Sequence, residues 1–244
     1  MFLSKLNKTL FVSAGSFSMG NTSDEAEEKE YHVHQVDVHD FYICPYLVTQ
    51  ALWLDVMGQN PSHFIGDDNP VENVSWLDCV EFCNKYSIRW GFSPCYQIDC
   101  DKVKLMNGGK GGFRLPTEEE WEFAARGGNL SRGFKYAGSN DVHEVAWCDS
   151  NEYDGTHPVG KKKPNELGLY DMSGNVWEWC WNQAGDDYFC TEQDAKYMND
   201  RDTYRIIRGG SWSEEAYRCR VSARGCDAPD LRCEFIGLRL VLNK

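Results

Sequence analysis

The sequence contains no apolar run of the roughly 18 residues that a membrane-spanning helix requires, so we expect no transmembrane segment. Positive charge is scarce: 25 lysines and arginines stand against 38 aspartates and glutamates, which gives a net charge of -13. Outside the lysine run 161–163 there is no basic stripe. Because the phosphate backbone of nucleic acid binds to a basic face, the composition excludes nucleic acid as the partner.

Metal-binding cysteine patterns are also missing. No Cys-x2-Cys pair occurs, and no cysteine pair lies near two histidines at zinc-finger spacing, which argues against a structural zinc site. The eleven cysteines are too few for a disulfide framework in a chain of 244 residues, and their odd number leaves at least one unpaired. Cys79 and Cys83 share a predicted helix face with Trp76, Val80 and Tyr86, so we expect both thiols to be buried.

Aromatic residues and glycine are abundant: 9 Trp, 12 Tyr, 12 Phe and 22 Gly. This composition is typical of short irregular elements packed around large flat side chains, and not of a helix bundle. We found no internal repeat, no low-complexity tract and no Pro/Ser-rich or charged linker. The sequence therefore predicts a single domain over residues 1–244.

Three helices can be predicted from their first residues. The first begins after Thr49 and ends at Gly58. The second begins at Ser75, where Ser-x-x-Asp forms a variant of the capping box. The third begins at Thr117, with Glu120 three positions later, and the glycine pair at 127–128 ends it.

Strands are expected at Phe11–Met19, His32–Val38, Phe41–Cys44, Tyr204–Arg208, Tyr217–Ala223 and Ile236–Val241. In the fifth strand, alternation predicts Tyr217, Cys219, Val221 and Ala223 on one face and Arg218, Arg220, Ser222 and Arg224 on the other. Residues 136–211 show little periodicity, which is typical of a site-forming region.

Eight strings appear in the order of one family's motifs: AGSFSMG (14–20), YLVTQ (46–50), NPVENVSW (69–76), FRLPTEEEWE (113–122), PVG (158–160), NELGLYDMSGNVWEW (165–179), RGGSW (208–212) and IGLRL (236–240). Together they resemble the formylglycine-generating-enzyme, or sulfatase-modifying-factor, domain over nearly the whole chain. The resemblance implies an α+β chain with that family's C-type lectin fold, built of short helices and strands with extensive irregular structure.

The resemblance also implies where catalytic groups would lie. The enzymes bind copper through two cysteines that follow the Gly-Gly-Ser motif, since copper prefers soft thiolates. Here 213–215 offers no cysteine, the second position matches Ala216, and Cys219 is interpreted as a core residue. His32 and His34 would suit a metal pair, but a solvated strand face is the stronger interpretation. We therefore expect no catalytic residues and no enzyme activity.

Residues 212–239 resemble the variable region of proteins diversified by retroelements, with the treponemal variable proteins as the nearest group. The fixed skeleton would be Gly209–Trp212, Ala216, Cys219–Val221, Arg224, Pro229, Arg232 and Ile236–Arg239. Adenine mutagenesis of Asn codons would produce the residues between, which we predict to bind ligand: Ser213, Tyr217, Arg218, Ala223, Gly225, Cys226, Asp227, Ala228, Asp230, Leu231, Cys233 and Phe235. Glu214, Glu215 and Glu234 cannot arise in this way. We expect Cys226 and Cys233 in an exposed loop; the alternative to a binding site is an ordinary pair of solvated loops.

A calcium ion is a second implication of the family. The matching positions are the side chains of Asp171 and Glu178 and the carbonyls of Met172, Gly174 and Val176, and hard oxygen ligands suit calcium. The alternative is that this turn is core architecture and its carboxylates bond backbone amides. No cofactor is required in either case, and calcium would be structural.

These observations predict a non-catalytic protein that displays a diversified ligand-binding site near 209–239 on a stable C-type lectin scaffold. Its partner would be a protein or other surface ligand, and the chain would be a monomer. The resemblance to the treponemal variable proteins implies an exported protein at the bacterial cell surface. Because the first residues lack the apolar stretch of a signal peptide, its signal, with any lipid anchor, would have been removed. The alternatives are an active formylglycine-generating oxidase and a degenerate family member with a regulatory or assembly role.

Overall fold

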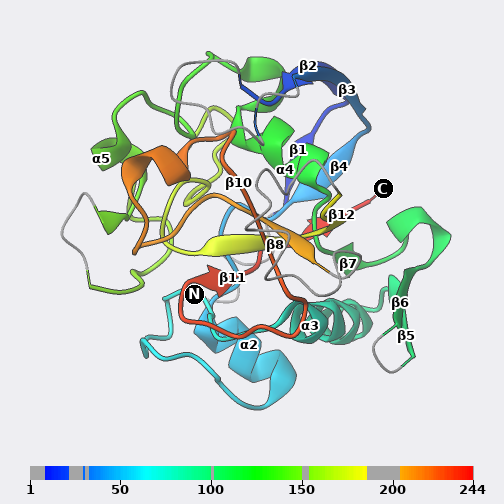
Figure 1. Ribbon diagram of the computed structural model, residues 1–244. Coiled ribbons are helices and arrows are strands. Elements are labelled where there is room, and N and C mark those ends of the chain that lie inside the picture. Colours follow the sequence, from blue (N-terminus) through cyan, green and yellow to red (C-terminus); the bar gives the residue numbers. More distant parts are fainter. Residues whose placement is uncertain are drawn as a thin grey trace.

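The computed structural model describes residues 9–21, 30, 33–99, 102–149, 154–185 and 204–243. In these ranges short helices surround two four-stranded sheets, with further irregular segments between them (Figure 1). No helix in the described ranges combines the length and the apolar character needed to cross a membrane.

The first sheet joins the two ends of the described chain. Its order is β1 (Leu10–Val12), β4 (Phe41–Ile43), β12 (Val241–Leu242) and β7 (Phe113–Arg114). All its pairings are antiparallel, and Val241 lies opposite Ile43 on one side and Arg114 on the other. The β12 strand therefore pairs the residues that follow the predicted binding segment with two strands from the first half of the chain.

The second sheet carries the predicted binding segment. Its order is β10 (Arg224–Asp227), β9 (Arg205–Arg208), β8 (Trp177–Gln183) and β11 (Ile236–Gly237). The β8 and β11 strands are parallel, and the other pairs are antiparallel. Trp177 and Trp179 are buried on one face of β8, and Glu178 and Cys180 are buried on the other, so the first half of this central strand is covered on both faces.

The remaining strands form two hairpins, β2 (Gly15–Met19) with β3 (His34–Val38) and β5 (Tyr96–Asp99) with β6 (Lys102–Leu105). The shortest helical turns are η2 (Asn107–Gly109), η3 (Gly128–Leu130), α5 (Val142–Val145) and η7 (Ala216–Cys219).

The three predicted helices are present as α2 (Gln50–Met57), α3 (Trp76–Arg89) and α4 (Glu118–Ala125). Thr49 accepts a hydrogen bond from the Leu52 amide, while Ser75 and Thr117 each form a complete capping box. Gly58 ends α2 in the left-handed region at φ 81°. The predicted starts are confirmed, and so is the burial of the cysteines at 79 and 83.

The predicted strand Tyr217–Ala223 is wrong. Its first residues form η7, a turn follows, and β10 begins only at Arg224. The cause is Arg208, whose guanidinium donates hydrogen bonds to the carbonyls of residues 221, 222 and 223. Successive carbonyls of a strand point in opposite directions, so three in a row that reach one guanidinium do not lie in a strand.

The predicted faces of that strand are wrong as well. Tyr217 is 40% exposed, although alternation placed it with the buried Cys219. Arg220 and Arg224 are buried, although alternation placed them on the opposite face.

Two other predicted strands are interrupted. The segment 11–19 is divided between β1 and β2, and the segment 236–241 between β11 and β12. The β8 strand, β7 and the β5–β6 hairpin were not predicted. His32, at the start of another predicted strand, lies outside the described residues.

Candidate ligand-binding surface

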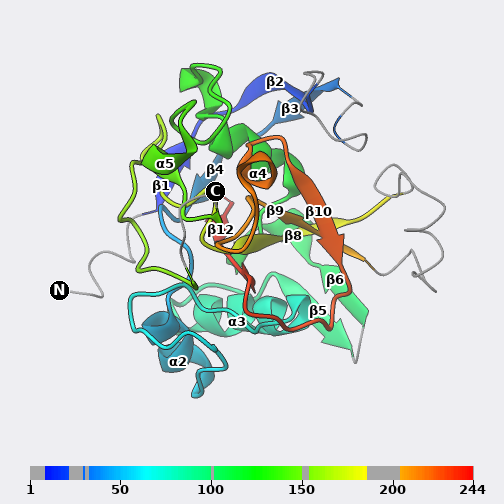
Figure 2. The same ribbon diagram turned by 60° about the vertical axis from the view of Figure 1, so that its left-hand side comes forward.

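The segment 209–239 supplies β10 and β11, the two edge strands of the second sheet, and between them it runs along α3, as the orange and red ribbon shows (Figure 2). Main-chain hydrogen bonds hold it there. The Leu77 amide donates to the Pro229 carbonyl (3.4 Å), and the Asn73 amide donates to the Cys233 carbonyl (2.9 Å). The segment is therefore attached to the scaffold along its length and is not a free loop.

Arginines in or beside this segment form ion pairs with carboxylates of the scaffold. The pairs are Arg208 with Glu122, Arg220 with Glu30 (2.7 Å), Arg224 with Glu118 (2.8 Å), Arg232 with Asp78 (2.8 Å) and Arg239 with Glu178 (2.9 Å). All but the Arg232 pair are buried. A buried arginine that loses its carboxylate leaves an unpaired charge, so these pairs fix the path of the chain.

Two tryptophans organise the surface between these anchors. The indole N–H of Trp212 donates to the Glu234 carbonyl (3.1 Å), and its ring meets the edge of Phe64 at 5.2 Å. Its backbone amide donates to the Asn175 carbonyl (2.9 Å). Trp212 thus joins the start of the segment, its end and the loop before β8.

Trp177 lies beneath the same surface. Its indole N–H donates to a carboxylate oxygen of Glu214 (3.1 Å), whose other oxygen lies 3.2 Å from the Arg218 guanidinium. That guanidinium lies 5.4 Å from the Trp177 ring. Glu214 is one of the three glutamates that adenine mutagenesis of Asn codons cannot produce, and this contact gives a physical reason for it to be constant.

The predicted ligand-binding residues divide into three groups. Exposed ones are Ser213, Tyr217 and Asp230; half-buried ones are Arg218, Cys226, Asp227, Ala228, Leu231 and Phe235; buried ones are Ala223, Gly225 and Cys233. The expectation of an exposed loop is therefore wrong for Cys233, which is buried, and for Cys226, which is half-buried in the β10 strand. Gly225 is buried because its backbone packs against Ile207, where an added Cβ would lie 2.9 Å from a side-chain carbon. The surface that can meet a ligand consists of the first two groups.

The end of this surface at β10 is acidic. Burial raises the pKa of Asp227, and the nearby charge of Asp230 raises it further, while a hydrogen bond from the Ala228 amide opposes them. Burial together with the charge of Asp227 also raises the pKa of Tyr204. A phenol and two carboxylates therefore share this end.

The position of the family's copper site contains no suitable ligand. Ala216 begins η7, and the nearest cysteine in the sequence, Cys219, is fully buried. A hydrogen bond with Cys148, followed by burial, raises the pKa of the Cys219 thiol well above its usual range. Among the described residues, no three His, Cys, Asp or Glu side chains are grouped as metal ligands.

The calcium positions fit an ion at one end. Asp171 is buried with φ 56°; one carboxylate oxygen accepts from the Gly160 amide (2.7 Å), and the other has no hydrogen-bond partner. Burial raises its pKa to about 6. A buried carboxylate oxygen without a hydrogen-bond partner is a hard ligand of the kind that calcium prefers. The carboxylate of Glu178, in contrast, already accepts hydrogen bonds from the Arg239 guanidinium and from the Trp121 indole N–H (3.0 Å). A calcium ion would therefore have to share these oxygens with Arg239 and Trp121.

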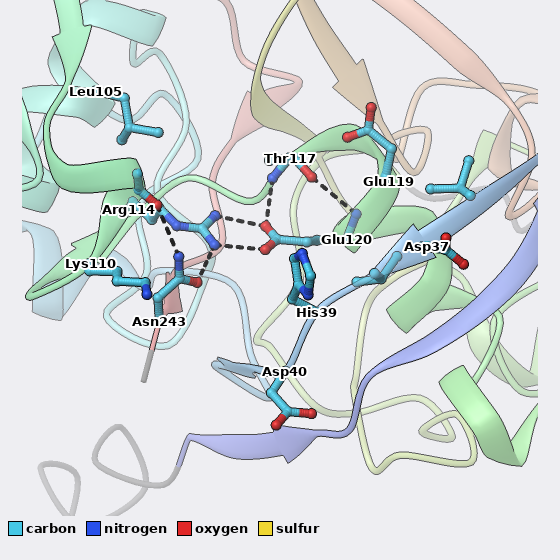
Figure 3. Close-up of a pocket in the computed structure, with 13 residues that line it drawn as sticks. Asp37, His39, Asp40, Leu105, Lys110, Arg114, Thr117, Glu119, Glu120 and Asn243 are labelled. Carbon is cyan, nitrogen blue, oxygen red and sulfur yellow. Dashed lines mark hydrogen bonds and ion pairs between the residues drawn. The ribbon is translucent and has the colours of Figure 1, made fainter.

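A separate pocket of about 710 Å³ lies between β3, β7 and the start of α4 (Figure 3). Its floor is the ion pair of Arg114 with Glu120 (2.6 Å), and Glu120 also accepts from the Thr117 amide (2.9 Å). Asp37 and Asp40, on its rim, accept from Ser16 and Ala14. No sequence motif indicated this pocket, because the capping box that lines it marks only a helix start.

Comparisons with known proteins agree with this architecture. The family described as a sulfatase-modifying factor enzyme 1-like domain matches residues 3–244. The chaperone protein LppX of Paenibacillus barcinonensis is 39% identical over 96% of this chain and 89% of its own length. The formylglycine-generating enzyme of Thermomonospora curvata is 32% identical over 79% of this chain, and the inactive C-alpha-formylglycine-generating enzyme 2 of Bos taurus is 31% identical over 79%. The chain spans 61% and 56% of the lengths of these last two proteins.

The solved structure of Treponema denticola variable protein 1 is similar over 97% of this chain and 95% of its own, with 35% identity and a TM-score of 0.84. The resemblances to this group and to the enzyme family are thereby confirmed, as is the predicted α+β fold of the C-type lectin type. An enzyme and an inactive relative match at nearly the same identity. The family alone therefore does not decide whether this chain is catalytic.

Proposed function

Because this chain belongs to the family of sulfatase-modifying factor enzyme 1-like domains, we propose its role within that family: non-catalytic binding of a ligand by the exposed and half-buried side chains of 213–235. The observation that carries the proposal is the set of arginine–carboxylate pairs. They fix the segment to the scaffold, while side chains between them reach solvent.

A segment whose arginines fix the backbone and whose other side chains reach solvent suits a diversified surface. Tyr217 and Phe235 would supply aromatic anchors, and Arg218, Asp227 and Asp230 would supply polar selectors, which is the mixture found in adaptable binding sites. The similarity to Treponema denticola variable protein 1 supports this assignment. The pairs would hold the backbone unchanged while these side chains vary.

The absence of catalysis is also our proposal. Copper activation of oxygen needs two soft thiolates, and the matching positions hold no cysteine. We further propose an exported, lipid-anchored monomer at the bacterial cell surface. Its partner would be a protein or other surface ligand and not nucleic acid. A calcium ion at Asp171 would be structural.

Population sequencing tests the proposal directly. We expect substitutions at the codons for the nine exposed or half-buried positions, and none at those for Arg220, Arg224 and Arg232. A reverse transcriptase gene and a near-copy of the segment differing at adenines should lie nearby in the genome. Substitutions spread evenly over both sets of codons would contradict a diversified binding surface.

A second candidate is an assembly role, favoured by the relative named as a chaperone that matches 96% of this chain. In that case the same surface would contact one constant client. Refolding yields of secreted enzymes with and without the full chain distinguish the two functions. A yield that rises with the chain, together with an invariant segment in the population, would favour the chaperone.

A further inference from the structure

Two buried cysteines meet directly behind the binding surface. Cys148 follows α5 and Cys219 ends η7, so they come from distant parts of the chain. Both are 0% exposed, and both belong to one small hydrophobic cluster that also contains Tyr136, Val142 and Val145. The proximity of Cys148 raises the pKa of the Cys219 thiol. The two side chains therefore share one small core while both thiols are reduced.

The backbone on each side of the pair is fixed. The Asp149 amide donates to the Glu214 carbonyl (3.0 Å), which ties the Cys148 loop to the binding segment. The Asn175 amide donates to the Trp147 carbonyl (2.8 Å), which ties the same loop to the start of β8. On the other side, Gly210 lies so close that an added Cβ would be 2.6 Å from the Cys219 sulfur. The fold thus holds the two cysteines together without a covalent bond.

We propose that Cys148 and Cys219 form a disulfide bond when the protein folds in the presence of a disulfide oxidant. The thiolate of one cysteine attacks the oxidant's disulfide, forms a mixed disulfide and releases one oxidant thiol. The thiolate of the second cysteine then attacks the first cysteine's sulfur, closes the bond and releases the second oxidant thiol. The two cysteines lose two electrons and two protons, and the oxidant's two sulfurs take up both.

The bond would fix the binding surface from below. It would join η7, which carries Tyr217 and Arg218, to the loop that contains Trp147, and would limit the motion of the backbone that carries these two side chains. Because both thiols are fully buried in the folded chain and the attacking species is the thiolate, exchange in the folded state should be slow. Closure is therefore expected during folding, before the pair is covered. None of this depends on the proposed ligand-binding function.

Peptide mapping tests the inference on the full chain. The reduced, unfolded protein is refolded in a buffer of reduced and oxidised glutathione, its free thiols are blocked with N-ethylmaleimide in denaturant at slightly acidic pH, and it is digested without reduction. We expect the peptide with Cys148 to be linked to the peptide with Cys219. Cys79 and Cys83, both buried on α3, serve as internal references and should be alkylated. Alkylation of Cys148 and Cys219 in the folded product, or linkage of either to another cysteine, would overturn the proposal.

Thermal unfolding provides a second measurement. The oxidised protein should melt several degrees above protein that was unfolded, reduced and refolded in dithiothreitol, because a crosslink restricts the unfolded chain. C148S should abolish this difference, and C226S, at a half-buried cysteine of β10, should retain it. If C148S does not fold, the mapping of the unaltered chain still decides. Equal melting temperatures for the oxidised and reduced chain would count against the bond.

Discussion

Arg220 and Glu30 form a buried, bidentate ion pair although 190 positions separate them in the sequence, with N–O distances of 2.7 and 3.1 Å. Arg220 also donates to the Tyr217 carbonyl (2.6 Å). One guanidinium therefore joins the N-terminal region of the chain to η7 and sets the position of an exposed aromatic residue. The other buried arginine pairs act on the same segment in a similar way.

Removing one partner of this pair should be costly. We expect R220A to lower the free energy of unfolding by about 3–5 kcal/mol, because Glu30 would be left as an unpaired buried charge. K85A removes an exposed ion pair with Glu81 and should change the free energy of unfolding by less than about 1 kcal/mol. Urea unfolding measures both. Recovery of stability in the double variant R220M/E30M would assign the loss to the orphaned charge, and similar effects of R220A and K85A would contradict this account.

The pair of Arg232 with Asp78 should give a pH-dependent contribution. Burial raises the pKa of Asp78, but the hydrogen bonds from Arg232 and Ser75 outweigh it, so the pKa lies below the usual 3.8. A lowered carboxyl pKa contributes stability above the unfolded value, and this stability is lost as the pH falls through the folded value. Because Arg232 is half exposed, we expect R232A to lose only about 0.5–1 kcal/mol near pH 6. The difference between R232A and the unaltered chain should shrink as the pH falls below the unfolded carboxyl value; a difference that does not change with pH would contradict the assignment.

Gly210 should tolerate no side chain. It has φ 74°, and an added Cβ would lie 2.6 Å from the Cys219 sulfur and 2.8 Å from the Arg218 carbonyl. Gly108 has φ 62° with nothing within 4 Å of an added Cβ, so G108A isolates the cost of the backbone conformation, about 1–2 kcal/mol. We expect G210A to lose clearly more free energy of unfolding than G108A. Equal losses would show that the contact with Cys219 is not tight.

Calcium should stabilise the chain through Asp171. We expect calcium at 100 times its Kd to add about 2.7 kcal/mol and to raise the melting temperature of chelator-treated protein. D171N should remove the response, because its buried oxygen would no longer carry charge, while D230N, at an exposed carboxylate, should preserve it. A melting curve that is the same with chelator and with calcium would exclude the ion.

Oxygen consumption should stay at the background rate when the chain is mixed with copper and a cysteine-containing peptide. The matching positions at 213–216 hold no cysteine, so no thiolate pair is available to bind copper. The Thermomonospora curvata enzyme is the positive control in the same assay. Turnover by this chain above that of a no-protein sample would overturn the non-catalytic proposal.

The helices could be predicted because their signals are local. Thr49, Ser75 and Thr117 cap helices through groups within three residues of themselves, and such short-range contacts can be recognised in sequence. The segment 217–223 alternates like a strand, but the side chain that decides its structure is Arg208, which lies outside that segment. The β8 strand was not predicted because Trp177 and its neighbours are buried on both faces, so its sequence shows no alternation of apolar and polar residues.

The location of the candidate surface could be predicted from the sequence, but the burial of its individual side chains could not. The order of the motifs located the segment and its constant residues, but the residues that pair with them are distant in the sequence. Arg224 pairs with Glu118, 106 positions away, and Arg232 pairs with Asp78, 154 positions away. Burial followed from the same distant contacts. Ala223, Gly225 and Cys233, predicted as display positions, are buried for this reason.

The indole N–H of Trp212 donates a hydrogen bond to the backbone carbonyl of residue 234, and the Asn73 amide donates one to the backbone carbonyl of residue 233. The amide of Trp177 likewise donates to the carbonyl of residue 235. Every residue type has such a carbonyl, so these contacts are indifferent to which side chain occupies positions 233 to 235. The number of residues between Trp212 and this stretch, in contrast, cannot change without breaking them. Evolution of the surface is thereby free in amino-acid identity and restricted in length, so a deletion of one residue should harm the protein more than several simultaneous substitutions.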